Sequence, residues 1–82
     1  MAGIARTPIQ LGNEIRERRR QLGLTQEQLA NQAGIRQRTV SDIESAGNAR
    51  LDTVMRLLAA LDFELVLRAR TKSAAKEIEE IF

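Results

Sequence analysis

The sequence has no cysteine and no histidine among its 82 residues. Without cysteine, the chain can form no disulfide and offers no thiolate ligand to a metal ion. Without histidine, it also lacks the commonest general base and the commonest metal ligand. Because these two absences close most routes to catalysis, we expect a protein that is not an enzyme and that needs no cofactor.

Long apolar runs are also missing. No stretch approaches the run of about 18 apolar residues that a membrane span needs. The first ten residues, MAGIARTPIQ, lack the charged-then-apolar layout of a signal peptide, so we expect a cytoplasmic protein. A chain of this length makes one domain at most, and because its core is small we expect it to be stabilised as a dimer.

The net charge is only +2, but it is unevenly distributed. Residues 1–50 carry eight arginines against five acidic residues, whereas residues 51–82 carry five basic against six acidic residues. The basic half is expected to face a polyanion such as nucleic acid. The run Arg18-Arg19-Arg20 does not make a single patch, because consecutive helix residues point about 100° apart.

Capping residues and glycines predict where the first helix begins and ends. Thr7 can cap a helix whose first residue is Pro8, and Gln10 can reach back to the cap amide. The helix is then expected to run to about Leu22, where Gly23 ends it.

Two short helices are predicted next. Thr25 caps the second helix with Gln28 as its capping-box partner, and this helix ends before Gly34. The third helix runs from Gln37 to about Ser45. Two short helices joined by a tight turn must cross steeply, which is the geometry of a helix-turn-helix.

A fourth helix and a strand follow. An apolar stripe predicts a core-packing helix that ends near Asp62; its members are Leu51, Val54, Met55, Leu57, Leu58 and Leu61. In the next six residues the period changes to two, with Phe63, Leu65 and Leu67 alternating with Glu64, Val66 and Arg68. A lone strand needs a mate, so we expect antiparallel pairing with the same segment of a second subunit. The alternative is that residues 63–68 continue the fourth helix.

The end of the chain differs in composition from the rest. Residues 73–82 can form a short amphipathic helix with Ile78, Ile81 and Phe82 on its apolar side and Glu77, Glu79 and Glu80 on its acidic side. A helix this short is marginal alone, so it would fold on a protein partner. The alternative is a frayed tail.

The beginning of the third helix carries residue types that read base edges. Glutamine pairs bidentately with adenine, arginine pairs with guanine O6 and N7, and serine suits several acceptors or donors. The residues expected to point outward there are Arg36, Gln37, Arg38, Ser41 and Asp42. Taken in isolation, the triplet Arg36-Gln37-Arg38 is better explained as part of an ordinary solvated surface helix, and only the surrounding pattern favours base reading.

The pattern around these helices resembles the Cro/phage-repressor helix-turn-helix family, of the xenobiotic-response-element type. The resemblance runs from about Leu11 to Leu61 and is carried by Ile15-Arg16-Glu17-Arg18-Arg19-Arg20-Gln21-Leu22-Gly23-Leu24-Thr25-Gln26, Gln28-Leu29-Ala30, Ala33-Gly34-Ile35 and Val40-Ser41-Asp42-Ile43-Glu44. The continuation through Asn48-Ala49-Arg50-Leu51-Asp52-Thr53, Leu57-Leu58-Ala59-Ala60-Leu61 and Leu65-Val66-Leu67-Arg68 resembles more narrowly the HipB-type antitoxins. Those are dimeric autorepressors that also hold a kinase-fold toxin.

The resemblance implies roles for individual residues. Gln26 would donate to a phosphate, and Arg36 and Arg50 would contact the DNA backbone on either side of the bases that are read. The bases would be read by Gln37, Arg38 and Ser41, and Asp42 would face the groove. Arg19 and Glu44 would form a partly buried structural salt bridge. Arg36 departs from the family, because many relatives cap the third helix with serine or threonine at this position.

The sequence therefore predicts a mainly α protein of four to five helices, with a short C-terminal β-strand that pairs across a homodimer. The expected parts are an N-terminal arm (1–7), a helix-turn-helix domain (8–62), a dimerisation strand (63–70, with Phe63, Leu65, Val66 and Leu67 at the interface) and a tail (71–82). The expected function is a repressor that binds a palindromic operator and is the antitoxin of a HipA-like toxin. The alternatives are a stand-alone phage-type repressor and a module whose main role is to neutralise a toxin.

Overall fold

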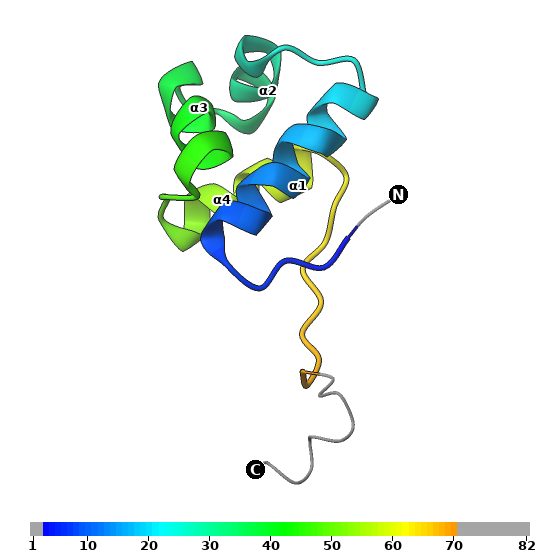
Figure 1. The fold of residues 1–82 in the computed structure, drawn as a ribbon. Coiled ribbons are helices and arrows are strands. Elements are labelled where there is room, and N and C mark those ends of the chain that lie inside the picture. Colours follow the sequence, from blue (N-terminus) through cyan, green and yellow to red (C-terminus); the bar gives the residue numbers. More distant parts are fainter. Residues whose placement is uncertain (1–2, 71–82) are drawn as a thin grey trace, which may run out of the picture.

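The structure is a computed structural model that describes residues 3–70. In this range the chain forms four helices, α1 (Pro8–Gln21), α2 (Gln26–Ala33), α3 (Gln37–Ala46) and α4 (Leu51–Ala60). The third helix packs against both α1 and α2, and α4 packs against α2 (Figure 1). None of the helices in the described range is long and apolar enough to cross a membrane.

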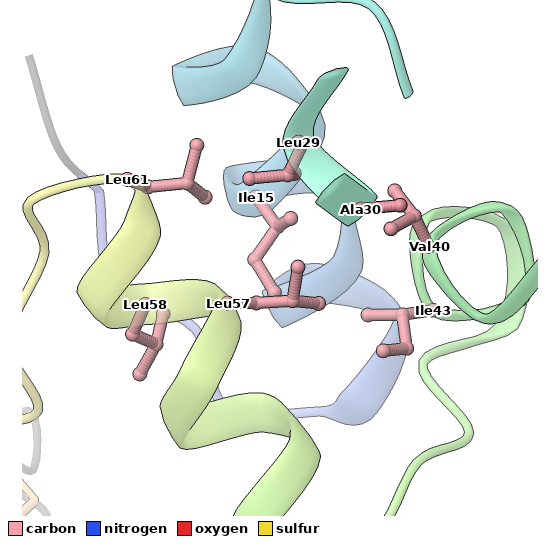
Figure 2. Packing of buried hydrophobic residues seen from close by; sticks show 8 residues of the cluster. All are labelled: Ile15, Leu29, Ala30, Val40, Ile43, Leu57, Leu58 and Leu61. Carbon is pink, nitrogen blue, oxygen red and sulfur yellow. The ribbon is translucent and has the colours of Figure 1, made fainter. Parts of the chain in front are cut away.

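One apolar core joins all four helices (Figure 2). Its members are Ile15 from α1, Leu29 and Ala30 from α2, Val40 and Ile43 from α3, and Leu57 and Leu58 from α4, with Leu61 just after it. Each is 4 % exposed or less. Burial of a large aliphatic side chain contributes roughly 1.5–3 kcal/mol, so this cluster is the main force that holds α3 in place.

The helix-turn-helix forms as the capping residues predict. The hydroxyl of Thr25 accepts from the amide of Gln28, and the side chain of Gln28 accepts from the amide of Thr25. At the other end of α2, Gly34 has a φ of 73° in the left-handed region, where glycine has no side chain to clash. The chain then turns back so that the amide of Ile35 donates to the carbonyl of Ala30 at 3.0 Å. The turn between α2 and α3 is therefore determined by local chemistry.

At the start of α1, one of the two predicted capping contacts is different. The hydroxyl of Thr7 accepts from the amide of Gln10 at 3.1 Å, as predicted. The side chain of Gln10, however, accepts from the amide of Arg6 at 2.6 Å, one residue before the cap amide that it was expected to reach. Thr7 itself has an extended backbone, and it is the amide of the residue before it that lies within reach of the glutamine.

The close approach between α1 and α3 occurs at Gly12. This residue is buried, and a Cβ atom added to it would collide with the backbone carbonyl of Ile43. The absence of a side chain at this position lets α1 and α3 pack backbone to backbone. The sequence analysis did not single out Gly12, so this contact was missed.

The apolar stripe of α4 packs onto the core only in part. Leu57, Leu58 and Leu61 are buried, but Leu51 is 71 % and Met55 is 43 % exposed. The expectation that the whole stripe packs inward was therefore wrong for these two residues in the single chain. The physical reason is that α4 closes one side of a small bundle, and no further element of the described chain covers its outer face.

The fourth helix stops where the sequence predicts, and it does not continue through residues 63–68. Asp62 adopts a left-handed φ of 59°, and the amide of Phe63 bonds to the carbonyl of Leu58 at 2.8 Å, a hydrogen-bond pattern that closes a helix C-terminus. The helical alternative for this segment is wrong.

Residues 63–70 form neither helix nor strand in the single chain and lead away from the bundle (Figure 1). Phe63 is partly buried against the core of its own chain, and the guanidinium of Arg18 lies 5.1 Å from the centre of its ring. The three apolar residues that follow Glu64, which are Leu65, Val66 and Leu67, are 51 to 87 % exposed. Because the strand is expected to pair with a second chain, it stays a prediction. The predicted tail helix of residues 73–82 lies outside the described residues.

Candidate nucleic-acid interface

Five of the predicted DNA-contacting residues line one open hollow on the surface. They are Gln26 from the first turn of α2 and Gln37, Arg38, Ser41 and Asp42 from α3. The tight turn at Gly34 places the start of α2 beside the exposed side of α3, which is why residues far apart in the sequence meet here. All five side chains are polar, so the hollow can exchange hydrogen bonds with a polar ligand.

The exposed side of α3 presents its residues at helical spacing. Gln37 and Arg38 are exposed in its first turn, and Ser41 is partly buried one turn later. The side chain of Arg38 is 89 % exposed and lies 4.0 Å from Asp42, measured from Nε to Oδ2. An ion pair this exposed contributes little stability, so both groups remain available to a partner.

The first turn of α3 has no side-chain cap. Arg36 occupies the N-cap position without a capping hydrogen bond, which is the departure predicted from the sequence. Arg50 takes the same position on α4, also without a capping bond, and its Nε lies 3.4 Å from Oδ1 of Asp52. A helix N-terminus carries partial positive charge from its unpaired amides, and an arginine beside it reinforces that charge. The start of α3 therefore favours an anion, whereas at the start of α4 the carboxylate of Asp52 offsets part of the positive charge.

Behind the hollow, Arg19 and Glu44 form the predicted ion pair. Nε and Nη2 of Arg19 donate to the two carboxylate oxygens of Glu44 at 2.7 and 3.0 Å, while Nη1 donates to the carbonyl of Leu24 at 2.8 Å. Their side chains are only 11 and 3 % exposed. The hydrogen bonds to Glu44 raise the pKa of Arg19 above its ordinary value, although burial opposes the shift. The pair joins α1 to α3 and holds α3 against the bundle.

The same carboxylate also holds Gln26, a contact that sequence reasoning missed. Nε2 of Gln26 donates to Oε1 of Glu44 at 3.2 Å. An amide nitrogen carries two hydrogens, so one remains to donate outward into the hollow. Nothing in the sequence spacing pointed to this contact, because it depends on how α2 crosses α3.

The arginine run of α1 separates as expected. Arg18 donates from Nε to the carbonyl of Leu61 at 2.9 Å, Arg19 is buried against Glu44, and Arg20 is exposed. Among residues 3–70 no group of three or more acidic side chains is arranged to hold a metal ion.

The comparisons with known proteins point to the same family. A helix-turn-helix family model matches residues 15–67. Antitoxin HipB of Escherichia coli strain K12 is 36 % identical over 75 residues, which cover 90 % of this chain and 84 % of the relative. The chain belongs to the helix-turn-helix family and, within it, to the HipB antitoxins.

Other relatives agree with this assignment. Antitoxin HipB of Escherichia coli O6:H1 (strain CFT073) is also 36 % identical over 75 residues, covering 90 % of this chain and 79 % of that protein. A solved complex of a HipB variant with an O2 20mer superposes with a TM-score of 0.80 at 32 % identity, over 87 % of this chain and all of that one. A HipA-HipB-O2-O3 complex superposes with a TM-score of 0.78 at 33 % identity, over 84 % of this chain and 99 % of that one.

Proposed function

We propose that this protein is a sequence-specific DNA-binding repressor that acts as a homodimer and serves as the antitoxin of a HipBA-type operon. The observation that carries the proposal is the hollow in which Gln26 meets four polar residues on the exposed side of α3. Similar solved structures, in which HipB is in complex with an O2 20mer or with HipA, O2 and O3, support the same function.

In the proposed complex, α3 enters the major groove by its N-terminal half. Gln37 pairs with adenine, Arg38 pairs with guanine O6 and N7, and Ser41 hydrogen-bonds to either type of base edge. Asp42 accepts a hydrogen bond from the amino group of a cytosine. Because its carboxylate is negatively charged and can only accept, it disfavours base pairs that present only acceptors to it. Together these four residues provide the sequence preference.

Contacts with phosphate fix the position of α3 in the groove. The outward N–H of Gln26 donates to one phosphate oxygen, in line with the amides at the start of α2. Arg36 and Arg50, at the starts of α3 and α4, bind phosphates on either side of the bases that are read. Such contacts orient the protein without reading sequence.

Dimerisation makes the repressor selective. Residues 63–70 of two chains pair as antiparallel strands, with Phe63, Leu65, Val66 and Leu67 at the interface. The two-fold axis then places two copies of α3 about 34 Å apart, in successive major grooves of a palindromic operator. Repression follows by occlusion of the promoter, and no cofactor or catalytic step is required.

The second partner in the proposal is a HipA-like toxin, present in the cytoplasm with the repressor. A solved relative is a complex of HipB with HipA, which supports this partner. A stand-alone repressor without a toxin is the other candidate. Co-expression with the product of a neighbouring kinase-like gene, followed by co-purification, distinguishes the antitoxin from the stand-alone repressor. The antitoxin retains the kinase-like protein during purification, and a stand-alone repressor does not.

The test of base reading uses an operator selected from a pool of random duplexes. Gln37→Ala and Arg38→Ala are each expected to lose about 1–3 kcal/mol of affinity for that operator and much less for random DNA. Asn31→Ala, an exposed change on α2 outside the hollow, is the matched control and is expected to bind as the unaltered protein does. Equal losses on both DNAs would remove these residues from base recognition.

A further inference from the structure

A second hollow lies beside the first and carries more positive charge. It is lined by Arg16, Arg19, Arg20, Gln26, Ser41, Glu44 and Ser45. Gln26 and Ser41 also line the first hollow, so the two form one continuous surface from α3 across to α1. Three guanidinium groups face a single carboxylate there, which leaves a surplus of positive charge.

The one carboxylate already accepts three hydrogen bonds, on both of its oxygens. Oε2 of Glu44 accepts from Arg19, and Oε1 accepts from both Arg19 and Gln26. Within residues 3–70, the acidic side chains form ion pairs with Arg19, Arg38 and Arg50, and none forms one with Arg16 or Arg20. These two arginines therefore carry charge that the described part of the chain does not neutralise.

Arg16 and Arg20 are also suited to act together. They lie four residues apart on the same side of α1, separated by about 6 Å of helix rise. Arg16 is partly buried, and its Nη2 donates to Oδ1 of Asn13 at 2.9 Å. This hydrogen bond holds the guanidinium in place and leaves its other N–H groups available, so less conformational entropy is lost when an anion binds.

From this arrangement we infer that Arg16 and Arg20 form a phosphate-binding site on α1, and that its ligand is the backbone of the DNA strand next to the bases read by α3. The inference rests on the proposed function, because α3 must lie in the groove for this strand to pass α1. DNA fits better than a free phosphate ion, because the hollow is open and runs into the recognition surface, where a continuous chain of phosphates would lie.

A phosphate site of this kind changes the affinity for all sequences and not the preference among them. Each lost phosphate contact is expected to lower the slope of log affinity against log salt by about 0.9. Arg16→Ala and Arg20→Ala should therefore each reduce the slope by nearly one on a random 30-base-pair duplex, and the double variant by nearly two. The same changes should leave the ratio of operator to random affinity unaltered.

The control variant is Arg56→Ala, which removes the same charge from an exposed position on α4 outside both hollows. Arg16→Lys and Arg20→Lys keep the charge and should retain most of the slope, and thermal melts of each variant verify that it folds. If the alanine variants match Arg56→Ala in slope while Arg50→Ala lowers it, the α1 site is wrong and the proposed function stands. If the unaltered protein binds no duplex, the proposed function itself fails.

A titration with inorganic phosphate distinguishes a free anion from DNA. The inference expects only weak binding of inorganic phosphate, in the millimolar range or above, observed through the NMR signals of the arginine side chains. The assignment to DNA would be overturned by two results together. The unaltered protein would be saturated by micromolar phosphate and the Arg16→Ala and Arg20→Ala variants would not, and these variants would bind DNA with an unchanged salt slope.

Discussion

Arg19 of α1 donates two hydrogen bonds, of 2.7 and 3.0 Å, to the carboxylate of Glu44 of α3, and both side chains are nearly solvent-free. The pair connects the two helices that also meet at Gly12, and it supplies the acceptor that holds Gln26. We therefore expect the stability of the fold and the proposed DNA contact of Gln26 to depend on the same carboxylate.

This relationship predicts different effects on folding and on binding. Arg19→Met or Glu44→Leu alone leaves an unmatched buried charge and should lower the free energy of unfolding by about 3–5 kcal/mol, measured by urea denaturation. The double variant should recover most of that loss, because neither charge remains. It should still bind DNA more weakly, because Gln26 has lost its acceptor. Full affinity in the double variant would show that the Glu44 contact does not position Gln26.

The pH dependence of this pair follows from the raised pKa of Arg19. Because the pKa is raised in the folded state, the contribution of the charged side chain to the free energy of unfolding is complete below the ordinary arginine pKa. It is lost only as the pH rises through the pKa of the folded state. The Arg19 side of the pair is therefore expected to contribute equally across the neutral and mildly alkaline range.

The close packing at Gly12 predicts that replacing this glycine by alanine lowers stability, which is opposite to the usual effect in a helix. In an exposed helix, glycine to alanine normally stabilises by about 0.5–1 kcal/mol. Here Gly12→Ala should instead destabilise by about 1–3 kcal/mol, because the new methyl group meets the carbonyl of Ile43 and pushes α1 away from α3. Thermal unfolding measures the effect, with the exposed change Glu17→Ala on the same helix as the control. A rise in the melting temperature of Gly12→Ala would contradict the close packing of α1 on α3.

Substitution of Arg36 is expected to have opposite effects on the stability of the fold and on DNA binding. Arg36→Ser supplies the side-chain cap that α3 lacks and should stabilise the protein by about 1 kcal/mol. It also removes the proposed phosphate contact of Arg36, so the slope of log affinity for DNA against log salt should fall by about 0.9. Arg36→Ala separates the two effects, because it should lose the same slope without gaining stability. If Arg36→Ser kept the full slope, Arg36 would not contact phosphate.

The dimer proposal is tested at Leu65. Leu65→Pro removes a backbone donor that strand pairing needs, whereas Leu65→Ala keeps the donor. Light scattering should therefore show monomers for Leu65→Pro and dimers for Leu65→Ala, and operator affinity should fall with the loss of the dimer.

The competing location for a dimer interface is the apolar stripe of α4, on the side that the core leaves uncovered. Leu51 and Met55 are exposed there, so Leu51→Glu and Met55→Glu test that face. A Leu65→Pro variant that stays dimeric, together with a monomeric Leu51→Glu variant, would place the interface on α4 instead of the strand.

Local chemistry along the chain was enough to predict the helices and the turn. Thr25 and Gln28 begin α2, Gly34 ends it, and the uncapped start of α3 was evident from Arg36. These features depend on residues within a few positions of each other, where capping and backbone preferences act directly. The residues expected on the exposed side of α3 could be chosen in the same way, because helical spacing determines which side chains share a face.

The contacts between residues of different helices depend on how the helices cross, and the spacing of residues in the sequence could not predict them. The approach of Gly12 to Ile43, the hydrogen bond from Gln26 to Glu44 and the hollow that contains Arg16 and Arg20 all join residues from different helices. The exposure of Leu51 and Met55 likewise depends on which side of α4 has a neighbour. A periodic pattern shows which residues share a face, but only the packed core determines what that face meets, because each contact depends on the position of every helix at once.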